Sequence, residues 1–199
     1  MKINQYLSAL SVVTVFSLSM ISCNGDSRQT SADNALKTNS VFESEVDRGK
    51  YLVGIMGCND CHSPKRLGEN GPEIIPELML SGYPSNRPVV TFDSKMIKEG
   101  FAMFYPDLTA AAGPWGISFA GNLTPHETGI GNWTEEQFKK ALTEGVFKGL
   151  DNSRMLLPPM PWVNYAEMKD EDIQAIFAYL KSIKPVDNLV PSPVSPDNM

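Results

Sequence analysis

Two cysteines and a histidine stand together in the stretch Cys58-Asn59-Asp60-Cys61-His62. On a helical turn, positions i, i+3 and i+4 share one face, so these three side chains would point the same way. Two cysteines two residues apart and followed at once by histidine are typical of covalent haem attachment. Each thiol would form a thioether with one haem vinyl group, and His62 would bind the iron from below the ring. The stretch therefore predicts one covalently bound haem c.

Other interpretations of the two cysteines are less well supported. A zinc site needs about four Cys, His or carboxylate ligands, and the chain has only three cysteines and two histidines. A redox dithiol would lie at the strand-to-helix turn of a βαβ unit, and no such pattern surrounds these cysteines. A chance match without any metal is the third alternative, and the spacing favours haem c over all three.

An iron held by one histidine has an open face, and the group that fills it separates electron transfer from chemistry. Methionine opposite histidine gives a six-coordinate haem with a raised potential, which suits electron transfer. Met160 lies in Leu157-Pro158-Pro159-Met160-Pro161-Trp162, where the prolines stiffen the loop and would hold the thioether at low entropic cost. We therefore predict Met160 as the second axial ligand. The alternatives are an empty site or one of Met155, Met168 and His126.

Three helices are expected to build the domain around this stretch. The first covers about residues 44–56 and leads directly into the cysteines. The second covers about 135–147, where Thr134 and Gln137 form a capping-box pattern. The third covers 170–184, with acids at its start, lysines at its end and an apolar stripe between them. We expect Gly49, with Tyr51 or Leu52, to meet this last helix at Ile176, Tyr179 or Leu180.

The beginning of the chain has the pattern of an export signal. Lys2 precedes an apolar and small-residue run that is too short and too rich in serine for a comfortable membrane span. The run ends in Ser22-Cys23, which resembles the lipobox of bacterial lipoproteins. Residues 1–22 are thus expected to be a lipoprotein signal peptide and Cys23 the lipidated residue. The alternative is an ordinary signal peptide, which would give a soluble periplasmic protein.

The remaining boundaries follow from composition. Residues 23–44 are polar and indicate a flexible tether, residues 45–185 the haem domain, and the proline-rich residues 186–199 an irregular tail. The chain has 17 basic and 23 acidic residues, a net charge of −6 that becomes −7 when Lys2 is removed with the signal. This acidic balance argues against binding to nucleic acid, which needs basic patches.

From Gly49 onward the chain resembles bacterial class I cytochrome c proteins, and especially the cytochrome subunits of membrane-bound alcohol and gluconate dehydrogenases. The matching stretches are 48–52, 58–62, Asn122-Leu123-Thr124-Pro125, 128–134, 159–162, Tyr165 and 170–172. The resemblance implies an all-α, cytochrome c-like fold in which the N- and C-terminal helices pack around haem c. It also implies that Cys58 and Cys61 bind the haem and that His62 and Met160 ligate the iron.

One difference from those subunits is that they carry several haems, whereas this chain has a single Cys-x-x-Cys-His. It must therefore exchange electrons with a separate redox partner, such as a dehydrogenase, an oxidase or another cytochrome. Residues 63–121 are longer than a minimal cytochrome needs, and we expect them to form an irregular insertion folded over the haem domain. The predicted function is electron transfer by a membrane-anchored protein that faces the periplasm. The alternatives are a haem oxidoreductase and a gas sensor, both of which need an open or labile sixth site.

Overall fold

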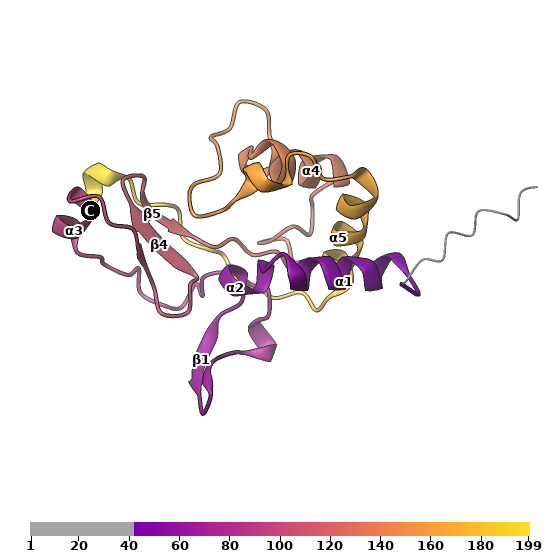
Figure 1. Ribbon diagram of the computed structural model, residues 1–199, viewed down its shortest axis with the longest axis horizontal. Helices are drawn as coiled ribbons and strands as arrows, with labels where there is room; N and C mark the ends of the chain where they lie inside the picture. The colour runs from indigo at the N-terminus through magenta and orange to yellow at the C-terminus, as the bar shows by residue number, and fades with distance from the viewer. Residues whose placement is uncertain (1–41) are drawn as a thin grey trace, which may run out of the picture. The chain divides into compact units, whose positions relative to one another are not determined.

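The computed structural model describes residues 42–199, which belong to one compact unit that begins at Ser40 (Figure 1). The predicted signal peptide, Cys23 and nearly all of the predicted tether lie outside the described residues. Within residues 42–199, the helices are all too short or too polar to cross a membrane.

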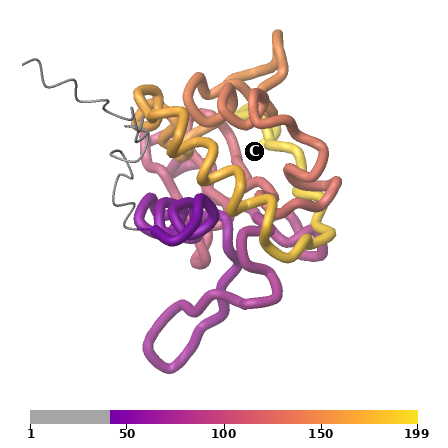
Figure 2. The backbone as a smooth tube through the Cα atoms, turned by 90° about the vertical axis from the view of Figure 1, so that its right-hand side faces the viewer, coloured from indigo at the N-terminus to yellow at the C-terminus, as the bar shows by residue number. Residues whose placement is uncertain are grey.

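The first and last long helices, α1 (Glu45–Ile55) and α5 (Asp170–Ser182), pack across each other (Figures 1 and 2). Ser44 caps α1 by accepting a hydrogen bond from the Asp47 amide. The helices meet at Gly49, where a Cβ atom would lie 1.9 Å from the carbonyl oxygen of Ala175 and 2.8 Å from the Cβ of Tyr179. The predicted contact of Gly49 with Tyr179 is thus confirmed.

Tyr51, the other expected partner, is largely turned to solvent. Its side chain is 51% exposed and its ring lies 5.2 Å from that of Phe42. Leu52 packs against the core instead, because it stands one position further round the helix.

The second predicted helix is α4 (Glu135–Glu144), and its capping box between Thr134 and Gln137 is present. It ends at Gly145, whose φ of 69° stops the helix before the predicted end near residue 147. Its apolar face joins α1 and α5 in one hydrophobic core, whose buried members are Val53, Leu80, Ile130, Phe138, Leu142, Ile173, Ile176, Tyr179 and Leu180.

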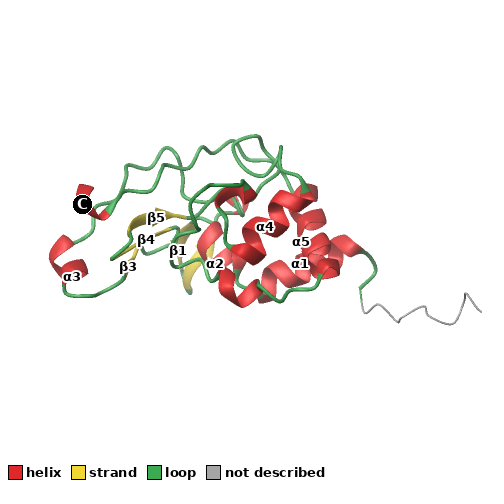
Figure 3. Cartoon of the chain, turned by 90° about the horizontal axis from the view of Figure 1, so that it is seen from above, coloured by secondary structure: helices red, strands yellow, loops and turns green. Residues whose placement is uncertain are grey.

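Residues 63–121 contain strands, which the sequence analysis did not foresee. Strands β1 (Lys65–Gly68) and β2 (Gly71–Ile74) form a hairpin (Figure 2). Strands β3 (Met103–Phe104), β4 (Ala110–Gly113) and β5 (Gly116–Phe119) form an antiparallel sheet in that order (Figure 3). The expected packing of the N- and C-terminal helices is present, but the all-α class is not confirmed as stated. The short helix α3 (Ser94–Lys98) packs on the sheet through Ile97.

The described residues also contain short 3₁₀ turns, which are η2 (Pro76–Leu78), η3 (Phe147–Gly149), η4 (Trp162–Tyr165) and η5 (Pro196–Asn198).

The residues after α5 return to the inserted segment. Val194 exchanges two backbone hydrogen bonds with Ile117 of β5, of 2.9 and 3.0 Å. Asn188 is buried, and its amide group donates to the carbonyl oxygens of Ser81 and Tyr83. Residues 186–199, which the sequence analysis sets apart as a tail, have little regular structure but lie within the same compact unit.

Candidate haem site

The two cysteines and the histidine occupy the five-residue helix α2 (Cys58–His62), which follows α1 almost at once. Gly57 separates the two helices with a φ of 70°, a left-handed conformation that glycine adopts at no steric cost. Both thiols are free and half-buried. The five residues form less than two turns, so Cys58, Cys61 and His62 share one face, as their spacing predicts.

The ring of His62 is held in one tautomer. Its Nδ1 atom lies 2.7 Å from the carbonyl oxygen of Gly121, and a carbonyl can only accept a hydrogen bond. Nδ1 therefore carries the proton, and the lone pair of Nε2 is left for a metal. Burial lowers the pKa of His62, and this effect outweighs the opposing effect of the hydrogen bond to Gly121. The lowered pKa keeps the ring neutral, and therefore able to bind a metal, at neutral pH.

Two chain segments lie side by side next to His62 and place the Gly121 carbonyl. The amide of Gly82 donates to the carbonyl oxygen of His62 at 2.8 Å, and the amide of Leu123 donates to Leu80 at 2.8 Å. The sequence analysis did not identify Gly82 or Gly121 as part of the site. The two glycines are visible in the sequence. The local sequence does not reveal which distant segment each of them packs against.

The loop after Gly121 is fixed by the buried side chain of Asn122. Its Oδ1 atom accepts from the amide and the hydroxyl of Thr124, at 2.9 and 2.7 Å. Its Nδ2 atom donates to the hydroxyl of Thr128 and to the carbonyl oxygen of Val186, at 3.1 and 2.9 Å. Residues 122–125, one of the stretches that resemble the cytochrome subunits, thus form a turn next to Gly121. This turn supports the carbonyl oxygen that accepts the hydrogen bond of His62.

Lysine caps the carbonyl end of the haem-binding helix. The ammonium group of Lys65 donates to the carbonyl oxygens of Asp60, Ser63 and Asp107, at 2.6, 3.1 and 3.1 Å. This cation satisfies backbone acceptors at the end of α2 and favours the helix dipole. It also joins the helix to the inserted segment, because Asp107 precedes β4.

Burial governs the ionisation of the two thiols. It raises the pKa of Cys58 to about 11. It also raises the pKa of Cys61, with Asp60 adding to the effect and Lys65 opposing it. Both groups are therefore protonated thiols at neutral pH. Burial raises the pKa of Tyr165 as well, and the charges of Cys58 and Cys61 add to that rise.

Met160 and Cys58 pack against the same hydrophobic core, although they are far apart in the sequence. The amide of Met160 closes a turn by donating to Leu157 at 3.3 Å. The carbonyl oxygen of Pro158, inside this turn, accepts a 2.6 Å hydrogen bond from the hydroxyl of Ser118. The sequence analysis did not foresee this role of the inserted segment.

Two of the three alternative ligands, Met155 and His126, have contacts elsewhere. Met155 is 46% exposed and forms an isolated bridge with Val146. The Nδ1 atom of His126 lies 2.9 Å from the hydroxyl of Thr128 and 3.7 Å from a carboxylate oxygen of Asp187. Met168 packs against the core, as Met160 does.

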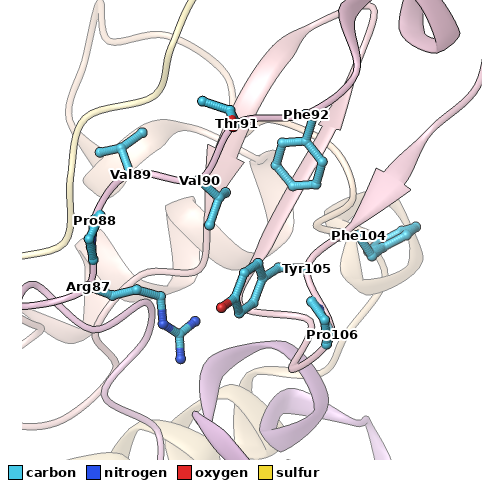
Figure 4. Close-up of a pocket in the computed structure, with 9 residues that line it drawn as sticks. All are labelled: Arg87, Pro88, Val89, Val90, Thr91, Phe92, Phe104, Tyr105 and Pro106. Carbon is cyan, nitrogen blue, oxygen red and sulfur yellow. The ribbon is translucent and has the colours of Figure 1, made fainter.

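The structure also has an open hollow of about 510 Å³, lined by residues 87–92 and 104–106 (Figure 4). Arg87 stacks there on the rings of Tyr83 and Tyr105, 5.0 and 4.6 Å from their centres. Its guanidinium group pairs with Asp107 at 2.7 Å. None of the lining residues belongs to the stretch 58–62 or to the Met160 turn, so the hollow lies apart from the predicted haem ligands.

The chain's own residues fit a covalent haem. Two free thiols and the open Nε2 of His62 share one face of a short helix, which is the donor set that haem c attachment requires. Cys58 on that face packs against the core that α1, α4 and α5 share. Together these features define a helical protein of the covalent-haem class.

Comparison with known proteins specifies the family. Residues 46–184 match the cytochrome c family, described as "Cytochrome c", and the chain belongs to it. The family carries covalently bound haem c, and the single pair Cys58 and Cys61 corresponds to one haem. Its members are electron carriers.

Three relatives are cytochrome subunits of dehydrogenases. The fructose dehydrogenase cytochrome subunit of Gluconobacter japonicus is 31% identical over 77% of this chain and 24% of its own length. The gluconate 2-dehydrogenase cytochrome c subunit of Pantoea cypripedii is 31% identical over 81% of this chain and 30% of its own. The cytochrome c subunit of the quinone alcohol dehydrogenase of Gluconobacter oxydans is 40% identical over 72% of this chain and 23% of its own. The chain thus spans about a quarter of the length of these relatives.

Proposed function

We propose that this chain carries single electrons through one haem c that is attached to Cys58 and Cys61 and ligated by His62 and Met160. The observation that carries the proposal is the hydrogen bond from Nδ1 of His62 to Gly121, which leaves Nε2 free. A hydrogen bond of this kind fixes the ring orientation and raises the basicity of the ligand. Met160 is supported by its proline-flanked turn and by its packing against the core that Cys58 also contacts.

When bound, the haem supplies a one-electron iron couple. The protein keeps both ligands in place as the charge of the iron changes. His62 cannot rotate without losing its bond to Gly121, and the three prolines around Met160 limit the movement of that turn. Fixed ligands and partly apolar surroundings favour rapid electron transfer, because the atoms around the iron move little when its charge changes.

The redox partner in this proposal is a separate protein, and the relatives suggest a dehydrogenase. The single haem motif of this chain supports an exchange between proteins rather than within one. The acidic chain, with a net charge of −6, would be steered towards a basic surface on the partner.

The test of the ligand set is optical. The purified protein should show a low-spin spectrum when reduced, and a methionine-to-iron charge-transfer band in the red when oxidised. Met160→Ala should abolish that band, lower the midpoint potential and admit carbon monoxide to the reduced iron, whereas Met155→Ala should change none of these. A wild-type protein that binds carbon monoxide rapidly would refute the proposal in favour of an open-site oxidoreductase or a gas sensor.

We further propose that the protein is exported and anchored in a membrane by a lipid on Cys23, facing the periplasm. This would leave no unpaired thiol, because Cys58 and Cys61 are used by the haem. The test is Cys23→Ser, with the export signal otherwise intact. The haem protein should move from the membrane fraction to the soluble periplasm, and an unchanged membrane fraction would refute the anchor.

A further inference from the structure

Ser118 of β5 is a buried serine whose hydroxyl reaches out of its own sheet. The hydroxyl lies 2.6 Å from the carbonyl oxygen of Pro158 and 3.4 Å from that of Ala111. A hydroxyl has one proton to donate, so the short contact to Pro158 is the hydrogen bond. The indole nitrogen of Trp115 lies 3.3 Å from the same oxygen and donates to it, which leaves the Ser118 proton directed at Pro158.

The turn that holds Met160 has few hydrogen bonds of its own. Pro158, Pro159 and Pro161 have no amide proton, and the Met160 amide is used within the turn on Leu157. Within residues 42–199, the bond from Ser118 is the one that ties residues 157–161 to a strand. Loss of a hydrogen bond between neutral groups is most costly when the remaining buried partner is left unpaired.

The same short segment also reaches His62. Gly121, three positions after Ser118, accepts the hydrogen bond of His62. One stretch of the inserted segment therefore touches the Met160 turn at one point and the His62 ring at the other. This juxtaposition gives residues 63–121 a role in the haem site itself.

We propose that Ser118 is a positioning residue for Met160, and that the inserted segment keeps the sixth position of the iron closed through it. The inference rests on the proposed ligand role of Met160. Removal of the Ser118 hydroxyl frees the Pro158 carbonyl and lets the turn move away from the core. The iron–thioether bond then opens more often, and an external ligand competes better, because apparent affinity rises with the fraction of open protein.

The test is a titration of the oxidised, haem-loaded full chain with imidazole, followed by the loss of the methionine charge-transfer band. Ser118→Ala should raise the apparent imidazole affinity about tenfold and lower the midpoint potential. Trp115→Phe, which removes the donor that orients Ser118 together with part of the indole ring, should give a smaller change in the same direction and serves as a second variant.

Ser81→Ala is the matched control. Ser81 is equally buried in the inserted segment and donates to Leu78 at 2.8 Å, but no hydrogen bond of its hydroxyl joins it to the Met160 turn. Its imidazole affinity should equal that of the wild type.

An unchanged affinity in Ser118→Ala, or an equal rise in both serine variants, would overturn the inference and leave the ligand assignment standing. A wild-type protein without the charge-transfer band would overturn the inference and the assignment of Met160 together.

Discussion

Gly82 lies directly against Gly121, so that a Cβ atom on Gly82 would stand 2.6 Å from the Gly121 carbonyl oxygen. That oxygen is the acceptor of the His62 hydrogen bond. Gly82 also has a φ of 80°, which side chains rarely tolerate. The absence of a side chain at position 82 thus permits the contact that orients the ring of His62, the proposed proximal ligand.

Gly82→Ala is therefore expected to push the Gly121 carbonyl away from His62. The weaker hydrogen bond makes the imidazole a poorer donor and should raise the midpoint potential, together with a stability loss of about 2–4 kcal/mol. Potentiometry and chemical unfolding measure the two effects. Gly71→Ala is the control, because it also has a positive φ but no atom within 4 Å of the added methyl. Equal potentials in the two variants would contradict the prediction.

Gly49→Ala should destabilise the whole domain. The added methyl would meet the Ala175 carbonyl at 1.9 Å, and the backbone of α5 must shift to admit it. The expected loss is about 2–4 kcal/mol in the free energy of unfolding, measured by denaturant titration followed by circular dichroism.

Gly54→Ala is a stringent control for Gly49→Ala, since it adds the same methyl to the same helix, where no atom lies within 4 Å. It should gain about 0.5–1 kcal/mol from helix propensity. A Gly49→Ala protein as stable as Gly54→Ala would show that the two helices do not pack so closely.

The sequence predicts the helical part of this fold well, for physical reasons. Thr134 and Gln137 cap α4 through local contacts, and the spacing of Cys58, Cys61 and His62 acts within one short helix. The strands of the inserted segment are short and were missed, because β4 is Ala110–Gly113, which lacks the alternation and β-branched residues of a typical strand.

The supports of the site were missed for a different reason. The contacts of Gly121 with His62 and of Ser118 with Pro158 join residues far apart in the chain. The sequence around a serine or a glycine does not indicate which distant residue it contacts. A single sequence therefore predicts the residues with distinctive chemistry, while tertiary packing determines which backbone groups hold them.

The ion pair of Arg87 and Asp107 predicts an acid-sensitive inserted segment. Burial works to raise the pKa of Asp107, but hydrogen bonds from Arg87 and Thr109 more than reverse it, so the folded pKa lies below the ordinary 3.8. A lowered pKa gives stability that is present above about pH 4 and is lost as the pH falls through the folded value.

Asp107→Asn should lower the free energy of unfolding by about 2–3 kcal/mol at pH 7, because Arg87 loses its partner in a largely buried site. The difference from wild type should shrink as the pH falls below 4, as chemical unfolding at pH 7 and pH 3 would show. A difference that is the same at both pH values would mean that the carboxylate charge plays no part.

Each cysteine of the haem motif should form its own covalent bond. Cys58→Ala should keep the haem attached through Cys61 after denaturation in acid, with one thioether fewer. The double variant Cys58→Ala and Cys61→Ala should release the haem completely. Mass spectrometry of the denatured chains measures the attached haem directly, and retention of haem by the double variant would contradict the assignment.

The pairing of Val194 with Ile117 means that the fold around the haem motif can close only after later parts of the chain have been synthesised. A ribosome completes Cys58–His62 before it makes α5 and the strand partner of β5, which lie later in the chain. Neither the helix crossing at Gly49 nor the edge of the sheet can close until then. The thiols therefore belong to an unfinished domain until those later residues have been made.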